Sequence, residues 1–155
     1  MEEPGYDGTR IVMQQYGFSP IPIPLEHDGI SVAETGRLSH VLLYITPSHQ
    51  FPMGSVLPIA KRLELLQWAA KSGSYILEDD YDSELRYHSL PIPSLQSIDN
   101  NERTIYMGTF SKSLSPDLRI AYLVLPRPLL GIYRTVFSHA NCSVSSLLQY
   151  ALAQF

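Results

Sequence analysis

The sequence predicts an α/β protein in which helices flank a mainly parallel β-sheet. Three short apolar runs, residues 41–46, 74–79 and 104–109, have the composition of buried strands. A long amphipathic segment separates the first two runs, and the order strand, helix, strand favours parallel pairing. Apolar residues make up 45% of the 155 residues, which is enough to fill the core of one domain.

The elements expected before the first of these runs are short. Residues 5–16 are predicted to form a helix and residues 19–25 a proline-rich strand. The tripeptide His-Asp-Gly at residues 27–29 is typical of a turn. Ser31 is suited to cap a short helix that runs to Leu38, because its hydroxyl accepts a hydrogen bond from a free backbone N–H.

The strongest helical signal follows the first strand. Pro58 begins this helix and Gly73 ends it, which is the usual placement of proline and glycine. The apolar positions expected to face the core are Ile59, Leu63, Leu66 and Ala70. Residues 119–125 are expected to form a last strand, and the chain beyond Pro128 is predicted to be helical to its end.

The composition excludes several classes of protein. The net charge is −4 and the 11 lysines and arginines are scattered, so the chain lacks the basic face that nucleic-acid binding needs. Its one cysteine, Cys142, rules out an internal disulfide and a cysteine-rich metal site. The acidic start of the sequence is not expected to be a secretory signal, and no apolar run approaches the ~20 residues of a membrane span. A cytoplasmic location without a membrane partner is therefore expected.

Polar loops follow the predicted strands, at the edge of a parallel sheet where ligands bind. Five carboxylates fall within residues 78–84, directly after the second strand. The alternatives for this run are a solvated acidic turn and a divalent-cation site. The spacing of an EF-hand is missing and there is no second acidic cluster, so we predict no metal site.

The loop at residues 108–119, after the third strand, is rich in hydroxyl groups around Lys112, and Arg119 ends it. Hydroxyls, a lysine and an arginine at the end of a strand suit a phosphate group. The alternative for Lys112 is an ordinary solvated surface lysine. The spacing of a nucleotide-binding P-loop is absent, which argues against a nucleoside triphosphate.

Taken together, the two loops resemble the site of fold type I enzymes that depend on pyridoxal 5′-phosphate (PLP). Five segments resemble more closely the aminotransferase-like domain of MocR-type regulators in the GntR superfamily. These segments are EEPGYDGTR (2–10), TPSHQFPMG (46–54), YILEDDYDSELRY (75–87), PIPSLQSID (91–99) and IYMGTFSKSLSPDLRIAYLVLP (105–126). The resemblance implies a partial fold type I large domain with PLP as its cofactor.

The resemblance also implies a role for each residue of the site. Lys112 would be the catalytic residue and bond to the PLP aldehyde as a Schiff base, for which its amine must be neutral. Asp79 would face the pyridine nitrogen and keep it protonated, while Asp80, the next residue on the strand, would point the other way. Tyr81 would donate a hydrogen bond to the phenolic oxygen. The phosphate would be held by Thr109, Ser111 and Arg119, and the ring would be stacked upon by Tyr6.

One position departs from the family pattern. Many fold type I aminotransferases carry an asparagine before the Pro-x-Gly of the loop after the first strand, and this chain has Phe51 there. His49 and Gln50 are candidates to replace the hydrogen bond of that asparagine to the phenolic oxygen. For His49, a buried structural role is the expectation.

The family's domain is more than twice this length, so residues 1–155 are expected to be its central part. The N-terminal winged-helix module and the small C-terminal domain are then absent. DNA would be bound only through that missing module. The full-length form is expected to be a homodimer that takes an amino compound as effector or substrate.

Three functions remain open at this point. The chain is a PLP-binding sensor domain of a transcriptional regulator, a fragment of a catalytic class I or II aminotransferase, or a non-catalytic α/β remnant that keeps the motifs by descent. The residues of the acidic loop and of the loop after the first strand favour the regulator. A fragment of this kind is not expected to be active alone.

Overall fold

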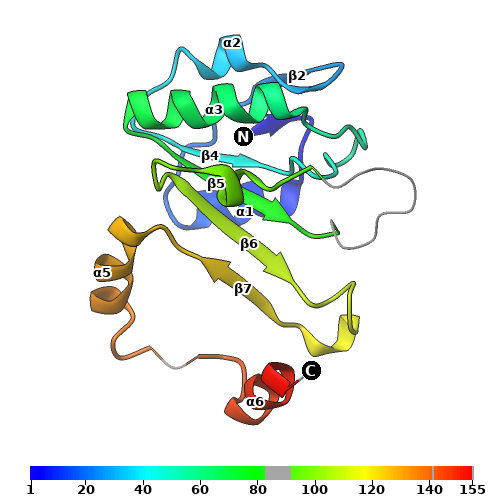
Figure 1. Ribbon diagram of the computed structural model, residues 1–155, viewed down its shortest axis with the longest axis vertical. Coiled ribbons are helices and arrows are strands. Elements are labelled where there is room, and N and C mark those ends of the chain that lie inside the picture. The colour runs from blue at the N-terminus through cyan, green and yellow to red at the C-terminus, as the bar shows by residue number, and fades with distance from the viewer. Residues whose placement is uncertain (83–91, 141, 155) are drawn as a thin grey trace.

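A computed structural model gives the fold of the protein and describes residues 1–82, 92–140 and 142–154. Its centre is a four-stranded sheet with the order β4-β5-β6-β7 (Figure 1). The strands are β4 (Leu42–Ile45), β5 (Tyr75–Asp80), β6 (Thr104–Thr109) and β7 (Ala121–Val124). The first three strands run parallel, and β7 runs antiparallel to β6. The predicted α/β class with a mainly parallel sheet is therefore confirmed.

A second sheet has three short strands. They are β1 (Glu2–Glu3), β2 (Ile23–Glu26) and β3 (Gly29–Ile30). Glu2 joins this sheet to the end of β4, because its carboxylate accepts hydrogen bonds from the N–H and hydroxyl of Thr46 at 3.1 and 3.0 Å. The predicted turn connects β2 to β3 as expected. The strand before it begins only at Ile23, four residues after the predicted start at Ser19.

Helices connect the strands. They are α1 (Asp7–Gln15), α2 (Val32–Thr35), α3 (Ile59–Ser72), α4 (Leu95–Ile98), α5 (Arg127–Val136) and α6 (Ser146–Gln154), with a 3₁₀ turn at Pro116–Leu118. Ser31 caps α2 by accepting a hydrogen bond from the N–H of Glu34 at 3.4 Å. The prediction of one continuous final helix is wrong, because α5 and α6 are separate. Between them, the Ser138 hydroxyl bonds to the carbonyl of Thr135, and serine side chains of this kind compete with helical hydrogen bonds.

None of the helices in the described residues combines the length and apolar character needed to cross a membrane.

The main core lies between α3 and the four-stranded sheet. Leu65, Leu66 and Ala69 of α3 pack there with residues of β4 and β5 such as Leu43 and Ile76. The predicted buried face of α3 is partly wrong, since Ile59 and Leu63 are 43% and 46% exposed. The face that is buried includes a charged residue, Arg62, so a count of apolar positions could not locate it.

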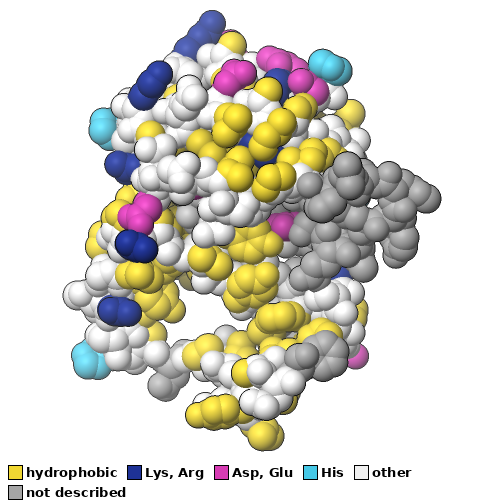
Figure 2. Space-filling view, viewed as in Figure 1, with side chains coloured by type: hydrophobic (Ala, Val, Ile, Leu, Met, Phe, Trp, Pro, Cys, Tyr) yellow, Lys and Arg dark blue, Asp and Glu magenta, His cyan; other side chains and the backbone are white. Residues whose placement is uncertain are grey.

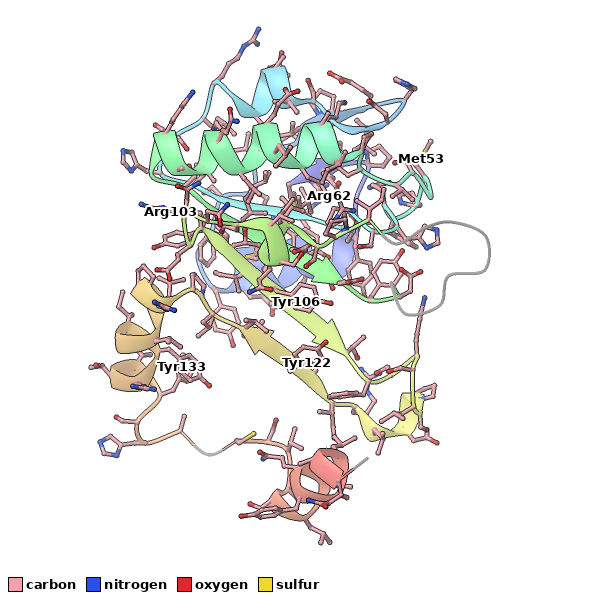
Figure 3. All side chains as sticks on the ribbon, in the orientation of Figure 1. Met53, Arg62, Arg103, Tyr106, Tyr122 and Tyr133 are labelled. Carbon is pink, nitrogen blue, oxygen red and sulfur yellow. The ribbon has the colours of Figure 1, made fainter. Side chains whose placement is uncertain are left out.

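The molecule exposes apolar side chains around β7. All four residues of β7 are exposed, as are Val136 of α5 and Leu147 of α6. Apolar side chains gather over this half of the molecule in Figure 2. Tyr122 of β7 and Tyr133 of α5, labelled in Figure 3, line a pocket of about 490 Å³. Apolar surface of this kind is typical of a face that another part of a protein covers.

Replacing Gly73 by alanine is expected to lower the free energy of unfolding by about 1–2 kcal/mol, the cost of a left-handed conformation in an L-residue. Gly73 ends α3 with φ 66° and ψ 22°, and a Cβ there would meet the His40 ring at 3.0 Å. Denaturant titration measures the effect. The control is Gly131→Ala inside α5, where the added Cβ would have no atom within 4 Å apart from adjacent residues and the helix's own backbone, so stability should hold or rise. Equal losses in the two variants would contradict this explanation.

Candidate functional site

The loops that follow β4, β5 and β6 meet at one edge of the sheet, because parallel strands end on the same side. These loops carry most of the residues singled out from the sequence. Residues 83–91, which include Glu84 of the acidic run, lie outside the described residues. The site residues that can be placed are His49, Asp79, Tyr81, Asp82, Thr109, Ser111, Lys112 and Arg119, with Tyr6 reaching the site from the segment before α1.

Asp79 lies near the carboxyl end of β5 and faces away from α3. Its Oδ2 accepts a hydrogen bond from the Tyr44 hydroxyl of β4 at 2.5 Å. Asp80 points to the opposite face of the sheet, where its carboxylate accepts a hydrogen bond from the hydroxyl of Tyr106 at 2.8 Å. Tyr106 is labelled in Figure 3. The expected separation of these two adjacent carboxylates is therefore confirmed.

Partial burial sets the protonation of Asp79. Loss of hydration raises the pKa of Asp79, the hydrogen bond from Tyr44 lowers it, and the nearby charge of Asp80 raises it, with a net increase above the ordinary value. Burial and the Asp79 charge also raise the pKa of Tyr44, which keeps this hydroxyl a donor. A carboxylate with a raised pKa gains much from a cationic partner, because that partner favours its charged form.

The described part of the acidic run, residues 78–82, does not gather its carboxylates in one place. Glu78 is fully buried, and its carboxylate accepts hydrogen bonds from the N–H groups of Leu95 and Gln96 at 2.9 and 3.0 Å. Arg62 reaches the same carboxylate from α3, at 3.6 Å (Figure 3). Glu78 therefore belongs to the core. Among the residues that the structure describes, no group of three or more His, Cys, Asp or Glu side chains is placed to hold a metal ion.

Lys112 and Tyr81 come together from different loops. The Nζ of Lys112 lies 4.6 Å from the centre of the Tyr81 ring, which is a cation–π distance. The Tyr81 hydroxyl donates a hydrogen bond to the backbone carbonyl of His49 at 2.7 Å. Burial and the charges of Asp82 and Asp79 raise the pKa of Tyr81 to about 12. Tyr81 is therefore a protonated donor at neutral pH, and it neighbours both Asp79 and Lys112.

Two more residues complete this group: His49, which the sequence offered as a candidate, and Asp82, which it did not single out. The Nδ1 of His49 lies 2.5 Å from Asp82 Oδ2, and the Nζ of Lys112 lies 3.5 Å from the same oxygen. The expected buried role of His49 is wrong, because its side chain is 51% exposed at the edge of the sheet. The sequence signal that could have placed His49 in the site is its position in the loop after β4, the strand next to β5.

The hydroxyl-rich loop is the turn that connects β6 to β7. The N–H of Phe110 and the hydroxyl of Thr109 both donate to the carbonyl of Ile120, at 3.0 and 3.2 Å. The hydroxyl oxygen of Thr109 also accepts a hydrogen bond from the N–H of Ser111 at 3.1 Å. Arg119 ends the turn with φ 51° and an exposed side chain. The turn therefore brings Thr109 and Ser111 together. Its last residue, Arg119, directly precedes Ile120, whose carbonyl is bonded to Thr109.

Tyr6 reaches the loop after β4. Its ring meets that of Phe51 edge to face, with 5.8 Å between the ring centroids. The side-chain amide of Gln50 donates hydrogen bonds to the carbonyls of Pro4 and Phe51, at 3.0 and 2.6 Å. Gln50 therefore ties this loop to the segment before Tyr6, and of the two candidate substitutes for the missing asparagine, His49 is the one that contacts Asp82.

Known proteins of similar sequence include regulators of transcription. The family model for aminotransferase class I and II matches residues 1–155. The chain is 46% identical to the uncharacterized HTH-type transcriptional regulator YdeL of Bacillus subtilis and 43% identical to the probable rhizopine catabolism regulatory protein MocR of Rhizobium meliloti. The alignments cover 99% and 100% of this chain but 33% and 31% of those proteins, so the chain spans about a third of their length.

A solved structure of similar fold is LysN, the α-aminoadipate aminotransferase of Thermus thermophilus, complexed with N-(5′-phosphopyridoxyl)-L-leucine. It aligns with a TM-score of 0.77 and 30% identity over 90% of this chain and 38% of that chain. The chain is therefore similar to this aminotransferase in the arrangement of its strands and helices as well as in sequence.

Proposed function

The chain belongs to the class I and II aminotransferase family, and from this premise we propose that it binds PLP as the sensor domain of a MocR-type regulator of the GntR superfamily. The observation that carries the proposal is the meeting of Asp79, Tyr81 and Lys112 at one edge of the sheet. Similarity to two transcriptional regulators supports the regulatory part. Similarity to LysN, whose structure holds a phosphopyridoxyl group, supports the cofactor.

The chemical groups of the site fit those of PLP. PLP presents a pyridine nitrogen, an aldehyde, a phenolic oxygen and a phosphate, and each needs a different partner. Asp79 offers a partly buried carboxylate with a raised pKa, Lys112 a primary amine and Tyr81 a protonated hydroxyl. The phosphate is matched by the hydroxyls of Thr109 and Ser111 and the guanidinium of Arg119.

Each residue has a separate task in this proposal. When bound, PLP supplies an aldehyde that bonds to amines and a ring that withdraws electrons from the bonded nitrogen. Lys112 would hold PLP at its aldehyde through the side-chain amine. Asp79 holds a proton on the pyridine nitrogen, and Tyr81 donates a hydrogen bond to the phenolic oxygen. Tyr6, whose ring contacts Phe51, would stack on the PLP ring.

We assign residues 1–155 to the central part of the PLP-binding domain. The relatives, about three times as long, support this assignment, and so does the apolar surface around β7 that the rest of a domain would cover. DNA binding is assigned to a winged-helix module outside residues 1–155, because these residues carry a net charge of −4. The effector is an amino compound, the whole protein is a homodimer, and it acts in the cytoplasm.

A second candidate is catalytic amino-group transfer, and the likeness to LysN favours it. Both functions use the same residues of this chain, so the site alone does not separate them. Steady conversion of an amino acid and an oxo acid by the whole protein would favour the enzyme. Binding of an amino compound that changes affinity for DNA without such turnover would favour the regulator.

Covalent labelling tests the binding of PLP. The protein is incubated with PLP, reduced with borohydride to fix the carbon–nitrogen bond, digested and analysed by mass spectrometry. The expected result is visible-light absorption before reduction and a pyridoxyl group on Lys112 after it. A label on another lysine, or no label, would overturn the proposal and leave the non-catalytic remnant as the better description.

Replacing Asp79 by asparagine is expected to weaken binding but not folding. Affinity for 4′-deoxypyridoxine 5′-phosphate, which has a methyl group in place of the aldehyde, should fall about 10- to 150-fold, equivalent to about 1.5–3 kcal/mol for a charged hydrogen bond. Fluorescence titration measures this affinity. Asp117→Asn, an exposed position on the 3₁₀ turn, is the control and should bind like the wild type.

The raised pKa of Asp79 gives the sign of the effect on stability. Burial favours the protonated form, so the ionised carboxylate destabilises the fold, and this cost is fully present above the raised pKa. Asp79→Asn removes that cost, and its free energy of unfolding at pH 7 should equal or exceed that of the wild type. As the pH falls through the raised pKa, Asp79 takes up a proton, and the free energy of unfolding of the wild type should approach that of the variant. A variant that is clearly less stable at pH 7 would show that Asp79 has a structural role instead.

A further inference from the structure

Two side chains from different loops converge on one oxygen atom, Asp82 Oδ2. His49 Nδ1 approaches it to 2.5 Å from the loop after β4, and Lys112 Nζ approaches it to 3.5 Å from the turn after β6. The Asp82 side chain is only 10% exposed. The Tyr81 ring stacks on the ring of His49, with centroids 6.0 Å apart, and Lys112 contacts the same tyrosine ring. The four residues thus form one connected group.

We propose that Asp82, held in place by His49, is the positioning residue of Lys112 and the acceptor of the proton that Lys112 must lose before it bonds to PLP. The inference rests on the proposed function and adds to it a residue that the family resemblance did not supply. Its basis is geometric, since the ammonium of Lys112 has a carboxylate oxygen on one side and the ring of Tyr81 beside it.

The proton balance of the step is simple. The ammonium of Lys112 gives one proton to the Asp82 carboxylate, and the freed electron pair of Nζ forms a bond to the aldehyde carbon. The two remaining protons of Nζ leave with the aldehyde oxygen as water, so that the carbon–oxygen double bond is replaced by a carbon–nitrogen double bond. The proton held by Asp82 then returns to the nitrogen. In this step His49 holds the Asp82 carboxylate in place by donating to it from Nδ1.

The other groups around Lys112 are less suited to accept this proton. Asp79 is bonded to the Tyr44 hydroxyl and faces the position proposed for the pyridine nitrogen. Tyr81 is already protonated, since its pKa is raised to about 12, and its hydroxyl is used by the carbonyl of His49. Asp82 is the carboxylate that the structure places against the Lys112 nitrogen.

The test compares the rate of covalent labelling with the affinity of the site. Labelling of Lys112 by PLP is stopped with borohydride at a series of times and quantified by mass spectrometry. Affinity is measured with 4′-deoxypyridoxine 5′-phosphate, which cannot bond to Lys112. We expect Asp82→Asn to slow labelling by about 100-fold, as removal of a positioned proton acceptor does, with the affinity for the analogue within about twofold of wild type.

Variants of His49 separate positioning from general structure. His49→Asn keeps an N–H at the position of Nδ1 and should label at nearly the wild-type rate, whereas His49→Ala should be slow. Asp117→Asn, in the same turn as Lys112, is the matched control and should label normally.

Three results would overturn the inference. The first is that Asp82→Asn labels as fast as wild type or faster. The second is that its affinity for the analogue falls in proportion to its labelling rate. The third is that His49→Asn and His49→Ala label at the same rate. Absence of a Lys112 label in the wild type would instead refute the proposed function, and the inference with it.

Discussion

Lys112→Ala is expected to abolish the covalent attachment of PLP while leaving part of the reversible binding. Covalent attachment needs a primary amine, and alanine supplies none. The carboxylate of Asp79 and the hydroxyls of the β6–β7 turn are unchanged, so the protein should still bind 4′-deoxypyridoxine 5′-phosphate. The measurements are visible absorption and peptide mapping after borohydride reduction, with fluorescence titration for the analogue.

The chain offers clear controls for this prediction, because it contains two other lysines, Lys61 and Lys71. The ammonium of Lys61 is held by the carboxylates of Glu26 and Asp28, each at 2.6 Å. Lys71 lies exposed near the end of α3. Lys71→Ala should therefore leave attachment unchanged. A label that persists in Lys112→Ala, or that disappears in Lys71→Ala, would contradict the assignment of the reactive amine.

The strands and the place where their loops meet, the candidate site, could be predicted from the sequence because these signals are local. Apolar runs mark β4, β5 and β6, and the rule that ligands bind at the carboxyl ends of parallel strands brings their loops together. The alternation of side chains along a strand was enough to separate Asp79 from Asp80, and the two indeed bond to Tyr44 and Tyr106 on opposite faces.

The contacts that the sequence did not indicate are long-range. Asp82 appeared only as one of five carboxylates in the acidic run, and nothing near it in the sequence indicates that His49 and Lys112 meet its side chain. The buried face of α3 was misplaced for the same reason. The predicted face was located from the spacing of apolar residues. That spacing does not indicate that Arg62 is buried, because its burial depends on carbonyl oxygens of distant segments that accept its N–H groups.

Arg62→Met is expected to lower the free energy of unfolding by about 3–5 kcal/mol, the usual cost of removing one partner of a buried ion pair. Arg62 is fully buried, and its guanidinium donates to the carbonyls of Leu57, Pro93 and Pro47 at 3.0, 3.0 and 2.8 Å. The carboxylate of Glu78, also fully buried, lies 3.6 Å away. Methionine fills similar space but leaves three carbonyls and one charge without this partner. Since whole domains are stable by about 5–15 kcal/mol, such a loss is severe.

The pH dependence and the double variant distinguish this cause from poor packing. Burial raises the pKa of Glu78 even beside Arg62, and removal of the cation should raise it further, so the loss in Arg62→Met should shrink as the pH is lowered and Glu78 takes up a proton. For the same reason Glu78→Gln combined with Arg62→Met should cost less than the sum of the single changes. Glu64→Gln, on the exposed side of α3, is the control and should stay within about 0.5 kcal/mol of wild type. A loss that is independent of pH and strictly additive would mean that the volume of Arg62, and not its charge, supports the core.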